Sequence, residues 1–352
     1  PTPPPGGGTC NGTATATVTI QRDTSAVPTL AGVTTALHYP APLGIPGVNG
    51  DQTVLDRVTN LTGVSGGIFS AGDQDSNGDG VDDLLQVGLV AIGMTFITLS
   101  GNFVSLAVEQ TAIICGILFA LALHHGWGWP AAVVAVLLAS IVMGVVQGAI
   151  VALGMNPIVT TLGAGAALFG LANVIVNNKT IQNDTTTAEW IGRARPFGIP
   201  TQSIAFVGLA VVGTIVLAKT RFGRKVALMG ANRAAAAASG ISLPMITIAA
   251  FAISAAAAGL AGIFVVAQIG QAKTTMFDNL TIDAVAAVLV GGTSIQGGEG
   301  SPARTALGAV FIALLINFML IRGDAYGQRL LVQGIIVALA VVGFHKLRTR
   351  AG

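Results

Sequence analysis

The sequence contains a run of 69 consecutive residues, Gln110 to Asn178, without a single Asp, Glu, Lys or Arg. A second uncharged run of 39 residues extends from Ala234 to Ala272. A membrane-spanning helix needs about 20 mostly apolar residues, so each run is long enough for at least one span. Soluble domains average about 25% charged residues, whereas this chain has 9%. The sequence therefore predicts a polytopic membrane protein and excludes an ordinary soluble enzyme or a nucleic-acid-binding protein.

The few charges divide the chain into two regions. Residues 1–84 carry a net charge of −6, and residues 85–352 carry a net charge of +8. Such an abrupt change of sign and composition indicates two differently built parts. We expect an acidic extracytoplasmic segment over 1–84 and a membrane domain over 85–352.

The acidic segment has the pattern of short strands. Thr13–Ile20 alternates polar and apolar residues, which predicts a strand, and Ala31–Tyr39 and Val54–Thr62 are further candidates between turn-forming residues. About 84 residues is fewer than the ~100 of a typical β-sandwich. We expect a β-rich or irregular segment, resembling a truncated secreted β-module.

The end of this segment has the spacing of a calcium loop. Its sequence DSNGDGVDD places oxygen ligands at every second residue around a Gly that permits a tight turn, as short calcium-binding loops do. The position that holds a bidentate Glu in a full EF-hand is Gln86. A solvated acidic turn is the alternative interpretation. The candidate calcium ligands of the 75–83 loop are Asp75, Asn77, Asp79 and Asp83.

The second region predicts about nine membrane helices and hence an all-α polytopic fold. Pro at or near the first helical position supports several of the predicted starts. Small residues four apart predict close helix contacts, at Gly144/Gly148, Ala255/Gly259 and Ala258/Gly262. The predicted spans are 86–105, 107–124, 131–153, 157–176, 203–218, 244–267, 282–292, 303–321 and 328–345.

The basic residues predict the orientation of these helices. Five bases crowd the 219–233 stretch with no acid nearby, and three more end the chain. Because positive loops stay on the cytoplasmic side, we expect the 219–243 loop and the C-terminus inside. Counting helices back from that loop places residues 1–84 outside.

Two blocks of the second region carry a family resemblance. TRFGRKVALMGANRAAAAASGISL (220–243) resembles the cytoplasmic loop of sugar-type ABC importer permeases, the ribose, xylose and galactoside group. IDAVAAVLVGGTSIQGGEGSPARTALGAVFIALLINFML (282–320) resembles a downstream segment of the same family. The resemblance implies a ten-helix permease whose first helix is missing here, in the plasma (inner) membrane.

The same resemblance implies partners and a coupling loop. Family permeases work as a pair, with two ABC ATPase subunits and a periplasmic or lipid-anchored solute-binding protein. The loop would transmit ATP-driven motion through a short helix seated in the ATPase. Enforcement of topology is the alternative role for its bases. The residues that match the family's coupling loop are Arg221, Gly223, Arg224, Asn232 and Gly240.

One stretch departs from the family pattern. Members carry Gly-Gly-Ile-Asp-Leu-Ser-Val-Gly after the second helix, whereas this chain has GNFVSLAVE over 101–109. Polar residues inside helices can line a solute path, although hydrogen bonding between helices explains each equally well. The candidates for a translocation path are Asn102, Gln147, Asn173, Gln268 and Asn317.

Several alternative functions fit the sequence. The family resemblance implies import of a monosaccharide-like solute by alternating access. The transported solute could instead be a branched-chain amino acid, a nucleoside or another small polar solute. An ion-coupled secondary transporter would need acids near the midplane, which the long uncharged runs lack. A chimeric permease that does not transport is a third interpretation. The chain lacks a nucleotide-binding Gly-x-x-x-x-Gly-Lys-Ser/Thr motif, so any ATP hydrolysis must occur on another subunit. We expect no enzymatic activity in this chain.

Overall fold

The computed structural model describes residues 83–102, 104–177, 179–182, 201–277, 279–294, 296–321, 327–328 and 331–336. All of them belong to one unit of the chain. The strands expected before residue 63 and the candidate calcium ligands Asp75, Asn77 and Asp79 lie outside the described residues. Asp83 is the first residue of helix α3.

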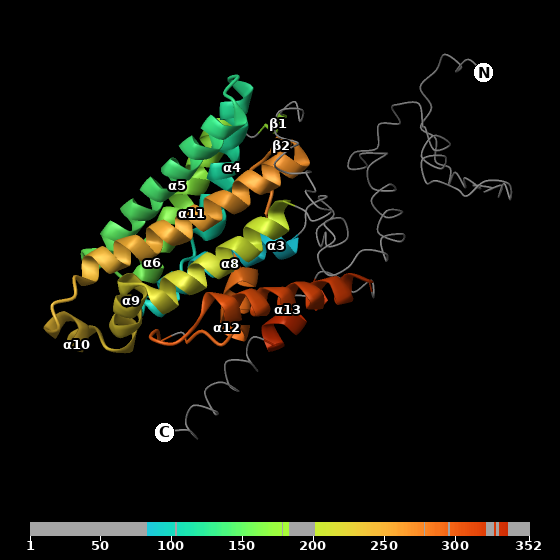
Figure 1. Ribbon diagram of the computed structural model, residues 1–352. Helices are drawn as coiled ribbons and strands as arrows, with labels where there is room; N and C mark the ends of the chain where they lie inside the picture. Colours follow the sequence, from blue (N-terminus) through green and yellow to red (C-terminus); the bar gives the residue numbers. More distant parts are fainter. Residues whose placement is uncertain are drawn as a thin grey trace, which may run out of the picture. The chain divides into compact units, whose positions relative to one another are not determined.

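The regular secondary structure of the described residues is helical apart from two very short strands (Figure 1). The helices are α3 (Asp83–Leu99), α4 (Val108–His124), α5 (Trp129–Ala152), α6 (Pro157–Val176), α8 (Thr201–Lys219), α9 (Arg221–Ala231), α10 (Arg233–Ala238), α11 (Leu243–Ile269), α12 (Leu280–Val290) and α13 (Pro302–Ile321). The strands are β1 (Ile181–Gln182) and β2 (Gln271–Ala272), which pair antiparallel.

This architecture confirms the all-α polytopic fold. Eight of the nine predicted spans correspond to an apolar helix, and the span over 157–176 matches α6 residue for residue. Five of these helices are at least 18 residues long and apolar enough to cross a membrane, whereas α3, α4 and α12 are shorter. The ninth span, 328–345, is helical at the residues that are described.

The prediction for the first span was wrong at its end. We expected a helix to residue 105, but α3 ends at Leu99. Gly101 has a φ of +73°, in the left-handed region that glycine adopts readily and that cannot continue a right-handed helix. The backbone therefore leaves the helix before Asn102, and the stretch up to Ala107 connects α3 to α4.

Helix α3 is the centre of the described unit. Every residue from Leu85 to Ser100 is buried. The helix contacts α8, α9, α11, α12 and α13, so it meets other helices on several sides. A helix that is apolar all round is expected to be enclosed by protein or lipid, and here protein encloses it.

Glycines let α11 approach its neighbours closely, as the small-residue pairs predicted. A Cβ at Gly144 of α5 would lie 2.6 Å from the Phe251 carbonyl oxygen of α11, and one at Gly148 would lie 2.8 Å from Ile248 Cα. On the other side, Gly262 of α11 lies against the backbone of α4 at the Ala112 carbonyl. In lipid, such close backbone packing replaces the hydrophobic drive of water-soluble cores.

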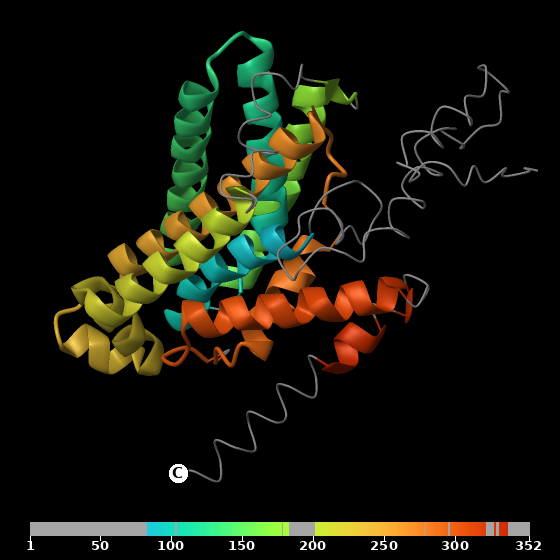
Figure 2. The same ribbon diagram turned by 45° about the vertical axis from the view of Figure 1, so that its right-hand side comes forward.

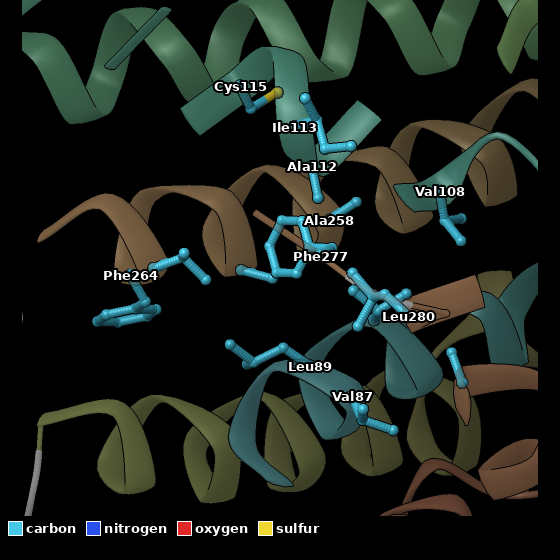
Figure 3. Close-up of a cluster of buried hydrophobic side chains, with 14 of the residues drawn as sticks. Val87, Leu89, Val108, Ala112, Ile113, Cys115, Ala258, Phe264, Phe277 and Leu280 are labelled. Atoms are coloured by element: carbon cyan, nitrogen blue, oxygen red, sulfur yellow. The ribbon is translucent and has the colours of Figure 1, made fainter. Parts of the chain in front are cut away.

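The apolar core lies between α3, α4, α11 and the start of α12. Figure 3 shows Leu89 of α3, Ala112 of α4, Ala258 of α11, and Phe277 and Leu280 close together. All five side chains are at most 6% exposed and belong to one buried cluster.

The two ends of the helices differ. At one end, α9 and α10 connect α8 to α11, and Figure 2 shows them beside the 291–300 connection between α12 and α13. At the other end, β1 after α6 pairs with β2 after α11, with Ile181 opposite Ala272. We refer to these as the α9–α10 end and the β1–β2 end.

Candidate functional site

Helix α9 has one buried and one exposed face. Val226 and Met229 are fully buried and pack with Leu99 of α3, whereas Arg221 and Arg224 are exposed. The Thr220 side chain caps the helix start by accepting a hydrogen bond from the Gly223 N–H at 3.2 Å. The cap and the buried face fix the helix, so its cationic face is exposed.

Gly223 has a packing role at the turn from α8 to α9. A Cβ at this position would collide with the backbone of Leu217, close to the carbonyl oxygen. Any larger side chain would push α9 away from the end of α8. The sequence predicted Gly223 as a coupling residue, and the structure places it in the buried support of the exposed arginines.

Helix α10 is short, and capping hydrogen bonds stabilise both of its ends. The Asn232 side chain accepts a hydrogen bond from the Ala235 N–H at 3.0 Å and so caps the helix start. At the other end, Gly240 has a φ of +74°, and the N–H groups of Gly240 and Ile241 donate to the carbonyls of Ala237 and Ala236. This pair of hydrogen bonds is a Schellman motif, for which glycine is favoured.

The position of these caps predicts how α10 will respond to mutation. Replacing Asn232 with Ala removes the cap and should cost about 1 kcal/mol of local helix stability. Amide hydrogen exchange across 233–238 should then become several-fold faster. Ser242→Ala is the control, because Ser242 precedes α11 without a side-chain cap bond. Equal exchange in both variants would contradict the capping role.

The polar residues predicted to line a path are dispersed. Asn102 is buried just after α3 and donates to Ser100 Oγ at 2.9 Å. Asn173 donates to the carbonyl of Phe169 in its own helix at 2.9 Å. Gln147 lies buried on α5, and Asn317 is partly buried near the end of α13. These four positions lie on four different segments of the described chain, namely the turn after α3 and helices α5, α6 and α13.

Gln268 is different, because it joins a polar group from another helix. Its Oε1 accepts a hydrogen bond from Gln202 Nε2 of α8 at 2.5 Å. Gln202 Oε1 and the neighbouring Ser203 Oγ are buried and have no hydrogen-bond partner within the described residues. The sequence analysis did not identify Gln202 as a candidate, because Gln202 lies just before residue 203, where the helix was predicted to start.

Two partly buried carboxylates at the α4–α12 contact have local partners. Glu109 Oε2 accepts the Thr281 N–H of α12 at 3.2 Å, and Asp283 Oδ1 accepts from Gln333 Nε2 at 2.5 Å. Both carboxylates lie close to the start of α12, where negative charge complements the helix dipole. Both carboxylates therefore have a local structural role at the start of α12.

Known proteins share the sequence of this helical region. Residues 83–343 match the family described as branched-chain amino acid transport system / permease component. The chain belongs to this permease family. It is therefore a multi-pass membrane protein of a transport system, and the match covers residues 83–343.

Curated relatives of this permease include sugar and autoinducer transport proteins. It is 31% identical over 264 residues to the ribose import permease protein RbsC of Escherichia coli (strain K12), covering 73% of this chain and 82% of the relative. It is 30% identical to the ribose import permease protein RbsC of Bacillus subtilis (strain 168), covering 72% and 80%. The autoinducer 2 import system permease protein LsrC of Salmonella paratyphi B is 31% identical, with 66% and 67% covered. No solved structure matches the chain.

Proposed function

We propose that this permease is the membrane subunit of an ABC importer in the plasma (inner) membrane, and that it carries a neutral, sugar-like solute. The observation that carries the proposal is the α9–α10 end. There, the capped helix α9 packs a buried face against α3 and exposes Arg221 and Arg224, and the short capped helix α10 packs against α9. Rigid exposed helices between two spans are suited to docking in a groove of a soluble partner.

The partners and orientation follow from that surface. We place the α9–α10 end and the C-terminus in the cytoplasm because of their excess of bases. The chain would form a pair with a second permease copy, two ABC ATPase subunits would dock at the two α9–α10 ends, and a solute-binding protein would deliver cargo at the β1–β2 end. ATPase closure would then switch the helices between outward- and inward-facing states.

The buried polar groups favour an uncharged cargo. Helix α11 and the buried residues Leu85–Leu99 of α3 contain no charged residue. Their buried polar groups are amides and hydroxyls, including Gln86, Thr247 and Ser254. An amino acid carries two charges that would need partners away from water, whereas the hydroxyls of a sugar need only neutral donors and acceptors. The ribose import permeases among the relatives also support a sugar-like cargo.

Gln268 and Gln202 are our candidates for contacting the solute near the β1–β2 end. Replacing Gln268 with Leu should raise the KM for ribose uptake about fivefold, the effect of losing roughly 1 kcal/mol of hydrogen bonding. Thr214→Val is the control, because the Thr214 hydroxyl bonds the Ala210 carbonyl of its own helix. Uptake should be measured in proteoliposomes with radiolabelled ribose and, separately, leucine. Saturable leucine uptake without ribose uptake would contradict the proposed cargo class.

A further inference from the structure

Three segments that are distant in the sequence meet through glycine backbone at the α9–α10 end. Gly101 follows α3, Gly230 lies in the last turn of α9, and Gly297 and Gly298 belong to the connection from α12 to α13. A Cβ at Gly297 would lie 2.6 Å from Gly101 Cα and 3.1 Å from Gly230 Cα. These separations leave no room for a side chain between the three segments.

Gly230 is the position at which the contact is closest. A Cβ there would collide with the Leu99 carbonyl oxygen and with the Gly298 nitrogen. Those two atoms are themselves joined, because the Gly298 N–H donates to the Leu99 carbonyl at 3.0 Å. The end of α3, the end of α9 and the 296–300 segment are therefore in direct backbone contact. We call Gly101, Gly230, Gly297 and Gly298 the glycine junction.

Side-chain hydrogen bonds also hold the connection from α12 to α13, which contains Gly297 and Gly298, against α3. Thr95 of α3 donates to Thr305 Oγ1 of α13 at 2.8 Å, and Thr305 Oγ1 lies 3.3 Å from Thr293 Oγ1. All three threonines are at most 3% exposed. A buried chain of hydroxyls thus ties the connection to α3 and α13, and the glycine junction ties it to α9.

We propose that the glycine junction positions α3 and the α12–α13 connection so that a displacement of α9 reaches both directly. This inference rests on the proposed function, in which α9 receives the motion of an ATPase. Contacts between side chains can absorb a small shift by changing rotamer, whereas backbone in van der Waals contact passes the shift on. Because α3 is the enclosed central helix, a movement of its end would reach the helices around it.

The variant that tests this inference is Gly230→Ala in the reconstituted complex with its ATPase and solute-binding protein. The added methyl should separate α9 from α3. We expect the complex to assemble and to hydrolyse ATP, while uptake falls at least about tenfold and solute no longer stimulates hydrolysis. Gly208→Ala on α8 is the matched control, since a Cβ there meets nothing within 4 Å. Normal uptake by Gly230→Ala beside an active wild type would overturn the inference.

A measurement on the wild-type complex covers the case in which Gly230→Ala does not fold. Hydrogen exchange should be followed over 95–101, 225–231 and 296–300, with and without trapped ATP. We expect the protection of all three segments to change together. A change confined to 225–231 would overturn the inference. Absence of ATP-driven uptake by the wild type would instead contradict the proposed function itself, so the two failures are distinguishable.

Discussion

Reversing the charge of Arg221 and Arg224 together, to Glu, is expected to reduce ATP-driven uptake by at least about tenfold, because losing one partner of a buried, hydrogen-bonded charge pair in an interface costs about 2–5 kcal/mol. Both side chains are exposed on α9, and the buried face of that helix consists of other residues. The variant should therefore fold and insert normally while its affinity for the ATPase falls. Co-purification with the ATPase and uptake in proteoliposomes measure the two effects separately.

The control for this charge reversal is Lys179→Glu. Lys179 is also exposed, but it lies beside β1 at the opposite end of the helices from α9. Its reversal should leave the affinity for the ATPase unchanged, which is the quantity that the control compares. If Arg221 and Arg224 served only to orient the chain in the membrane, the double variant would instead show misoriented protein with an unchanged affinity for the ATPase.

Replacing Gly262 with Val is expected to destabilise the permease strongly, because it inserts a branched side chain between two helix backbones. Gly262 lies against the Ala112 carbonyl of α4, and a Cβ there would also be 3.0 Å from the Gly116 nitrogen. The added side chain would force α4 and α11 apart, and overpacking of this kind typically costs about 1–3 kcal/mol. We expect a drop in thermal stability of several degrees and poor recovery of monodisperse protein in detergent.

Gly208→Val provides the matched comparison for Gly262→Val. Both positions lie inside apolar helices, but Gly208 has open space where the side chain would be added. The two variants therefore share the loss of backbone freedom and differ in packing alone. Equal thermal stability of the two variants would show that the contact between α4 and α11 does not depend on Gly262.

The helices could be predicted from sequence where local signals mark their ends. Helix α6 begins at Pro157 after Asn156, whose side chain accepts the Ile158 N–H at 2.9 Å, and it ends before Asn177 at a φ of +51°. Uncharged residues between such signals define the span. The end of the first span was predicted wrongly, at residue 105, whereas α3 ends at Leu99. Within an apolar stretch, Ser100 and Gly101 alone do not mark a helix end, and only their contacts in the fold do.

The tertiary contacts of the site could not be predicted in the same way. Gly101, Gly230 and Gly297 are each ordinary in the sequence, and only folding brings them together. The pairing of Gln202 with Gln268 joins residues 66 apart, so no local pattern contains it. By contrast, the arginines and the cap at Asn232 belong to one contiguous loop. Its resemblance to a known family, together with its charge, makes this loop the candidate coupling site from sequence alone, and that assignment stays a prediction.

In the proposed mechanism, ATP hydrolysis on a separate subunit drives a solute through this chain by way of α9 and α10. The most direct measurement is ribose uptake into proteoliposomes that contain the permease, its ATPase and the solute-binding protein, with and without ATP. We predict uptake that requires all three proteins and ATP, and that is lost with the Arg221 and Arg224 reversal. Uptake by the permease alone, driven by an ion gradient and insensitive to that reversal, would contradict the mechanism.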